Sequence, residues 1–340
     1  MQYRMHTTNS KVTIVMYHYV RNLASSRYPN IKGLELHTFK KHLEFFASYY
    51  KVITMQDFLL ALNGQKDLPK NALLLTFDDG LLDHYLHVFP LLKAYNFQGS
   101  FFINAKTLDE CTTPPPQLSL LDVHKIHFIL ANRSNTDNLL KELYNMLDYA
   151  RANGYSLPSN NELFFQYAKA NRWDNKKIIF IKRILQNVLD KDLRQTIASQ
   201  LFKKYVGVCE NIFARELYMN ADQLKLMQQE GMFIGVHGYD HFWMDCIDKK
   251  VFENDLNKAL VILSDFIDKK NFVYCYPYGG YNNHLIDFLK SKRCATAFST
   301  EPRIANLHTE NPYLIPRIDC NDITLSLSTT PKIFNKKSKV

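Results

Sequence analysis

The sequence predicts an α/β protein built around parallel strands. Short runs of apolar and β-branched residues alternate with helical patterns over much of the 340-residue chain. A repeated strand, helix, strand order favours parallel strands with helical crossovers, because parallel neighbours cannot be joined by a tight turn. Several apolar runs end in acidic residues or histidines, which is typical of strands that carry a site at their carboxyl ends. The apolar fraction of 46% suits one large domain or two ordinary ones.

The first part of the chain predicts four strands and three helices. Residues 12–16 are apolar or β-branched and lead directly into Tyr17 and His18, while Leu43 and Phe46 recur at helical spacing and Gly64 ends a helix. The predicted strands are 12–16, 51–53, 72–77 and 99–104, and the predicted helices are 38–50, 55–62 and 86–94.

The alternation stops at Pro114-Pro115-Pro116, and from Leu118 to about Tyr218 only polar helical patterns follow. We therefore expect a single domain over residues 1–340, interrupted by a helical insertion at about 117–218, with a basic tail at 325–340.

The strand and helix pattern resumes after the insertion. Asn220 is a predicted helix cap with Gln223 in the reciprocal position, and Gly231 ends that helix. The remaining predicted strands are 232–236, 272–275, 295–298 and 314–318, with a helix around 251–267.

Composition indicates a protein without a nucleic-acid or membrane signature. The formal charge of +9 comes mostly from scattered helix faces and the tail, although it would also attract an anionic substrate. Six cysteines occur without a CxxC pair, which fits reduced thiols, and the polar amino terminus predicts neither a signal peptide nor a transmembrane helix. We expect a cytoplasmic location.

Two strand ends predict a metal site. Asp78 and Asp79 follow the apolar run 72–77, and His237 and His241 follow the run 232–236. Two buried carboxylates require a compensating cation, and two imidazoles with one carboxylate bind zinc while leaving positions open for water and substrate. Either motif alone is weak, since an Asp-Asp-Gly sequence is often a turn and two histidines four residues apart are often one helix face.

Other residues are weaker candidates. The pairs His84 and His87, and His124 and His127, fit helix faces better than metal sites. Cys275 is interpreted as a buried thiol, because no adjacent residue would activate it as a nucleophile.

Three segments resemble motifs of the polysaccharide deacetylase family, also known as the NodB homology domain or carbohydrate esterase family 4. They are Thr76–Gly80, His237–His241 and Tyr276–Gly279; Tyr17-His18 and Leu314–Arg317 also resemble segments found in members. The resemblance covers both flanks of the chain but not the insertion. It implies a distorted, incomplete (β/α) barrel of about seven parallel strands, similar to a TIM barrel.

The resemblance also implies site roles and a reaction. Asp79, His237 and His241 would hold a divalent metal, most often zinc, and Asp78 would be the general base for a metal-activated water. Tyr278, with its neighbour Pro277, would bring a backbone N–H to the oxyanion. The implied reaction is hydrolysis of an N-acetyl group on an amino sugar of a polysaccharide or a saccharide precursor.

The chain departs from the family pattern in three places. Gly238 replaces a usual Ser or Thr, and Cys275 lies where many members carry an arginine that orients the base. We therefore expect Arg317 to reach Asp78 instead. No histidine follows Arg317, so His18 is the predicted general acid, whereas His308 is interpreted as a loop residue.

Two alternatives stay open at this point. One is a non-catalytic carbohydrate-binding protein on the same fold, and the other is an iron enzyme with a site of two histidines and one carboxylate. The expected partner is an N-acetylated saccharide, whether polymeric, nucleotide-linked or lipid-linked. Three roles stay open for the helical insertion: covering the cleft, forming an oligomer interface, or meeting a membrane surface.

Overall fold

The computed structural model describes residues 10–110, 117–132 and 135–323. They form two compact units: the sheet unit takes 10–22, 33–110 and 217–323, and the helical unit takes 23–32, 117–132 and 135–216. The proline run at 114–116 and the basic tail at 325–340 lie outside the described residues.

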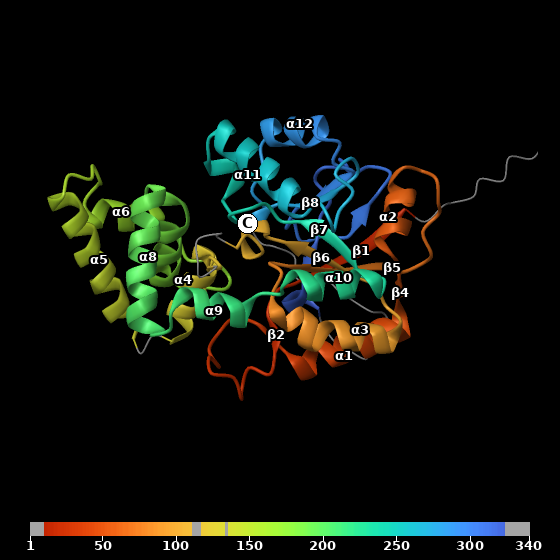
Figure 1. The fold of residues 1–340 in the computed structure, drawn as a ribbon, viewed down its shortest axis with the longest axis horizontal. Helices are drawn as coiled ribbons and strands as arrows, with labels where there is room; N and C mark the ends of the chain where they lie inside the picture. The colour runs from red at the N-terminus through yellow and green to blue at the C-terminus, as the bar shows by residue number, and fades with distance from the viewer. Residues whose placement is uncertain (1–9, 111–116, 133–134, 324–340) are drawn as a thin grey trace, which may run out of the picture. The chain divides into compact units, whose positions relative to one another are not determined.

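A curled, mostly parallel sheet forms the centre of the sheet unit (Figure 1). Six strands pair in parallel in the following order: β1 (Lys11–Tyr17), β5 (Ala72–Asp78), β6 (Gly99–Ile103), β7 (Phe233–Val236), β8 (Val273–Cys275) and β9 (Thr296–Phe298). Short strand β4 (Lys51–Val52) pairs with β5, and β2 (Val20–Arg21) pairs separately with β3 (Leu34–Glu35). The expected distorted, incomplete (β/α) barrel is confirmed, as a mostly parallel curled sheet with helices.

Short segments near the carboxyl terminus pair with the last strand of this order, β9, and with the first, β1. Ile315 forms a parallel bridge with Phe298 of β9, and β11 (Ile318–Asp319) pairs in parallel with β1. Strand β10 (Ala305–Asn306) pairs with β1 in the antiparallel direction. The predicted continuous strand 314–318 was therefore wrong in its extent, because this segment crosses from one strand edge to another.

Side chains of the strands alternate between two cores. Leu73, Leu75 and Phe77 face an outer core covered by five helices, whereas Leu74 belongs to the inner core. The covering helices are α1 (Leu36–Tyr49), α3 (Phe89–Tyr95), α10 (Ala221–Gln229), α11 (Lys249–Ile262) and α12 (Asn283–Ser291). Helix α2 (Met55–Leu62) packs Phe58 into the inner core, where its ring contacts that of Phe298.

Local sequence signals explain several helix ends. The Asn220 side chain accepts the Gln223 backbone N–H while Gln223 returns a bond to the Asn220 backbone, as predicted. The helix expected at 86–94 begins earlier, as a π-helical turn over His84–Val88 that leads into α3.

The described residues of the predicted insertion are mainly helical, as expected. Its helices are α4 (Asp122–Asn132), α5 (Thr136–Ala152), α6 (Asn160–Tyr167), α7 (Lys176–Arg183), α8 (Lys191–Tyr205) and α9 (Glu210–Leu217). Aromatic rings pack in its core, with Phe128 and Phe202 both contacting Phe213. In the part of the chain that the structure describes, no helix combines the length and apolar character needed to cross a membrane.

Candidate active site

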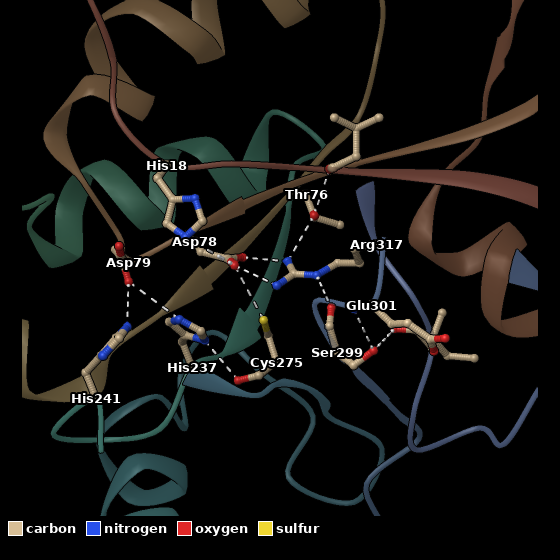
Figure 2. A network of polar contacts seen from close by, with 12 residues as sticks. His18, Thr76, Asp78, Asp79, His237, His241, Cys275, Ser299, Glu301 and Arg317 are labelled. Carbon is tan, nitrogen blue, oxygen red and sulfur yellow. Dashed lines mark hydrogen bonds and ion pairs between the residues drawn. The ribbon is translucent and has the colours of Figure 1, made fainter. Parts of the chain in front are cut away.

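The acidic pair Asp78 and Asp79 lies at the carboxyl end of strand β5, and the alternation of side chains along the strand determines where Asp78 points. Thr76 and Asp78 point to the same side of the strand as Leu74, towards the inside of the curled sheet. Asp79 follows the strand at a positive φ of 79°, so the two adjacent carboxylates face different neighbours. Figure 2 shows Asp78 directed at Arg317, and Asp79 directed at His237 and His241.

Arg317 holds Asp78 in a two-pronged ion pair. Its Nη1 and Nη2 donate to the two Asp78 carboxylate oxygens at 2.8 and 2.7 Å, and both side chains are almost fully buried. The guanidinium also donates to Thr76 Oγ1 and, through Nε, to the Ser299 carbonyl oxygen. The expected contact between Arg317 and Asp78 is therefore present, and it comes from the segment that links β9 back to β1.

The charge of Arg317 decides the ionisation of Asp78. Burial by itself would raise the pKa of Asp78, but the Arg317 guanidinium, with a smaller effect of His237, lowers it to about 2. Asp78 is therefore an oriented carboxylate at neutral pH.

Asp79, His237 and His241 present three donor atoms to one point. Asp79 Oδ1 lies 3.5 Å from His237 Nε2 and 3.3 Å from His241 Nε2, and all three side chains are buried. Ligands bound to zinc at about 2.0–2.1 Å in tetrahedral geometry lie about 3.3 Å from one another, by the bond lengths typical of such sites. The donor set therefore fits a divalent metal with room for further ligands.

His237 is oriented as metal-binding histidines usually are. Its Nδ1–H donates to the Cys275 carbonyl oxygen at 2.9 Å, which leaves the Nε2 lone pair facing Asp79. Burial lowers the pKa of His237 to about 4, despite the opposing effect of the acidic pair. The ring is neutral at physiological pH, as a metal ligand must be.

The loop between the two histidines is held by Asp255 of α11. The buried Asp255 carboxylate accepts the backbone N–H groups of Tyr239 and Asp240 at 2.8 and 2.9 Å. Gly238 has a φ of +76°, and a Cβ there would lie 2.9 Å from Asp255 Oδ2. A Ser or Thr at position 238, as in the family pattern, would therefore be strained in its backbone and crowded against the Asp255 carboxylate.

Strained backbone is concentrated at this site. Asp79, His241 and Tyr278 have φ angles of 79, 53 and 58°, a region that residues with a side chain rarely adopt. Each such residue costs of order 1–3 kcal/mol and persists where surrounding contacts impose it, often at functional sites. Tyr278 lies in the turn Pro277–Gly279, and its ring meets the His241 ring edge-on at 4.6 Å.

His18 lies on the other side of Asp78 from Arg317 (Figure 2). Its Nε2 is 3.9 Å from Asp78 Oδ2, and its side chain is 41% exposed, so it is open to solvent and substrate. The buried His84 donates through Nε2 to the His18 carbonyl oxygen at 2.9 Å, which fixes the backbone there. His308 is exposed in a turn, in agreement with its interpretation as a loop residue.

Cys275 is a buried thiol, as expected. Its Sγ lies 3.6 Å from Asp78 Oδ2, and burial raises the pKa of the thiol well above its usual value. Among the described residues, the groups with metal-site geometry are Asp79 with His237 and His241, and Asp78 with His237 and Cys275. The second group is less suited to a metal, because Asp78 is already paired with Arg317.

Sequence reasoning missed several supporting residues. Asn104 donates to Asp79 Oδ1 at 3.3 Å, and Thr76 accepts from Arg317. Asp255 had a detectable signal, since it is an acidic residue on the apolar face formed by Phe252, Leu256 and Ala259 in the same helix.

Comparison with known proteins places the chain in a family. A family model described as "Polysaccharide deacetylase" matches residues 65–146 and 197–296, which is more than half of the chain. The chain belongs to the polysaccharide deacetylase family. That family consists of hydrolases that act on amide bonds. The resemblance inferred from the motifs is confirmed.

One curated relative agrees with this assignment. The Bacillus subtilis (strain 168) protein named "Putative polysaccharide deacetylase YxkH" is 29% identical over 100 residues, covering 29% of this chain and 34% of that protein. The match thus spans about a third of that relative's length.

Solved structures show the same fold. IcaB from Ammonifex degensii superposes with a TM-score of 0.53 and 17% identity, covering 92% of each chain. The Streptococcus pyogenes deacetylase PplD, in complex with acetate, gives 0.52 and 14% identity, covering 91% of this chain and 92% of that one. At these identities the likeness establishes the fold, a distorted (β/α) barrel, as expected.

Proposed function

We propose that this protein is a metal-dependent hydrolase that removes the acetyl group from an N-acetylated amino sugar. One observation supports this most: an Asp-His-His donor set lies beside a second carboxylate that a buried arginine keeps ionised and oriented. Such an arrangement separates metal binding from proton transfer, which amide hydrolysis requires.

The donor set would hold a divalent metal through Asp79, His237 and His241. Zinc is the preferred ion, because nitrogen and oxygen donors at these separations suit its tetrahedral geometry. When bound, the metal would make a water molecule more acidic and would polarise the amide carbonyl.

Asp78 would act as the general base. Its carboxylate lies within 4.8 Å of a His237 ring nitrogen, so it is close enough to accept a proton from a water attacking at the donor set. Arg317 fixes both carboxylate oxygens and so limits the directions from which that proton is accepted. The backbone N–H of Tyr278, in the turn that starts at Pro277, would stabilise the oxyanion.

His18 would act as the general acid. It is the histidine next to Asp78 on the exposed side, where it could protonate the leaving amine of the sugar. The substrate is proposed to be an N-acetylated saccharide, in free, polymeric, nucleotide-linked or lipid-linked form.

The test is acetate release measured together with metal content. Purified protein is stripped with a chelator, reloaded with zinc, cobalt or manganese, and assayed on N-acetylglucosamine, N-acetylchitotetraose and UDP-N-acetylglucosamine. Asp79→Asn should lose metal and activity together, whereas Asp78→Asn should keep metal and lose turnover. Asp287→Asn on the surface of α12 is the matched control.

Two results would contradict this proposal, and each would support a different function. Saccharide binding without acetate release by the metal-loaded protein would identify a carbohydrate-binding protein. Turnover that requires both iron and oxygen would identify an oxygenase instead.

A further inference from the structure

Trp243 extends the candidate site with an aromatic surface. It follows His241 by two residues, and its ring stacks on that of Tyr278 with centroids 4.6 Å apart and planes within 13°. Tyr278 in turn meets His241 edge-on at the same separation, with planes at 86°. A proposed metal ligand, a tyrosine and a tryptophan therefore form one continuous row of rings.

Gly280, which follows the turn Pro277–Gly279, leaves space for the Trp243 indole. A Cβ on Gly280 would lie 2.3 Å from Asp245 Oδ1, 2.8 Å from Trp243 Cδ1 and 2.9 Å from Trp243 Nε1, so a residue with a side chain at this position would displace both the Asp245 carboxylate and the indole. Gly280 therefore lets the turn after β8 lie directly against Trp243. Two loops from different strand ends, one after β7 and one after β8, together fix this aromatic pair.

Trp243 and Tyr278 are more exposed than the residues of the two hydrophobic cores. Trp243 and Tyr278 are both half-buried, whereas Tyr274 and Tyr276 on the adjacent strand end are buried. A tryptophan needed only for core packing would be enclosed by apolar side chains, but this one lies at the carboxyl end of the sheet beside polar site residues. That position is typical of aromatic residues that contact a ligand.

We infer that Trp243 binds the sugar ring of the substrate. A pyranose has a face of C–H bonds that packs flat against an aromatic ring, while its polar substituents reach groups at the edge. In this arrangement the ring lies on Trp243 and the acetamido group extends along Tyr278 towards His241 and Asp79. The inference rests on the proposed function and adds a residue that recognises the sugar rather than the acetyl group.

A purely structural role for Trp243 makes different predictions. If the indole only steadied Tyr278, its removal would change the oxyanion donor and lower kcat, with little change in KM. If it binds the sugar, Trp243→Leu should raise KM about tenfold with kcat changed by less than about threefold, since 1.4 kcal/mol corresponds to tenfold. Trp243→Phe keeps an aromatic ring and should recover most of the affinity.

The two tryptophans of the chain allow a binding test that is independent of turnover. Trp173 is 47% exposed and lies in the helical unit, so Trp173→Phe leaves Trp243 as the single reporter. Titration of this variant with N-acetylchitotetraose or UDP-N-acetylglucosamine should give a saturable change in fluorescence. The matched control, Trp243→Phe, retains Trp173 and should show no saturable change.

The outcomes separate this inference from the proposed function. A saturable signal from Trp243 without acetate release would support sugar binding while removing the deacetylase proposal. A saccharide that the protein deacetylates, but that leaves Trp243 fluorescence unchanged and has the same KM with Trp243→Leu, would overturn the inference. Absence of both binding and acetate release with these probes would overturn both.

Discussion

The buried pair of Asp78 and Arg317 gives the sharpest energetic prediction. Their side chains are 2% and 0% exposed, so neither can turn to water when its partner is removed. Arg317→Met leaves an unpaired carboxylate, Asp78→Asn leaves an unpaired guanidinium, and the double variant leaves no net charge. The two substitutions should therefore not be additive in the free energy of unfolding.

The structure sets the size of this effect. The attraction of Arg317 lowers the pKa of Asp78 from its usual 3.8 to about 2 even though burial opposes it. At 1.36 kcal/mol per pKa unit, this favours the folded state by about 2.5 kcal/mol above pH 4, a contribution that is lost as the pH falls towards 2. Each single variant should lose about 3–5 kcal/mol, and the double variant should lose less than their sum by about 2–3 kcal/mol.

Urea unfolding of the metal-free protein at neutral pH provides the measurement. In the Trp173→Phe background, fluorescence reports Trp243 and hence the sheet unit. Lys93→Met is the control, because Lys93 pairs with Glu230 and both side chains are more than 40% exposed; it should cost no more than about 1 kcal/mol. Additivity within about 0.5 kcal/mol would refute the reasoning.

Three further predictions concern the loop, the buried histidines and the acid. Asp255→Ala should weaken zinc binding about 10–100-fold, because the loop between the two histidine ligands loses both anchors; an unchanged Kd in a chelator competition would contradict this. Burial lowers the pKa of His42 and of His237 from 6.5 to about 4 in the folded state. As the pH falls from about 6.5 to 4, both histidines therefore bind protons in the unfolded chain but not in the folded protein, and the folded protein loses stability. Metal-free protein should lose up to about 3 kcal/mol per histidine over this range, and His42→Phe should flatten the curve measured by urea unfolding. His18→Ala should slow acetate release about 100-fold at normal metal content, and full turnover would exclude its role as the acid.

The main features of the site could be predicted because they depend on local patterns. The apolar run 72–77 is shorter than a typical helix and lies between polar residues, so it predicts a strand with the adjacent acidic pair at its carboxyl end. The same reasoning placed His237 after β7, and parallel pairing through β6 brings both strand ends together.

Residues that reach the site across the fold were harder to predict. The 314–318 segment reads as one strand, but it bridges β9 and β1, and no local pattern specifies that crossing. The contact of Arg317 with Asp78 was expected from a missing arginine near position 275, not from periodicity. Trp243 belongs to no motif, and Asp255 stands out only as an acidic residue on an apolar helix face, because the importance of both depends on which loops lie beside them.

The segment that carries Arg317 also bears on how the site is assembled during synthesis. Asp78 precedes its partner by 239 residues, which at about 5–20 residues per second means a delay of roughly 12–48 seconds on the ribosome. Through that interval β5 has its acidic end but no guanidinium to neutralise it. The nascent sheet therefore cannot bury Asp78 as an ion pair until the closing segment has emerged. Completion of the fold and formation of the oriented carboxylate are consequently one late event.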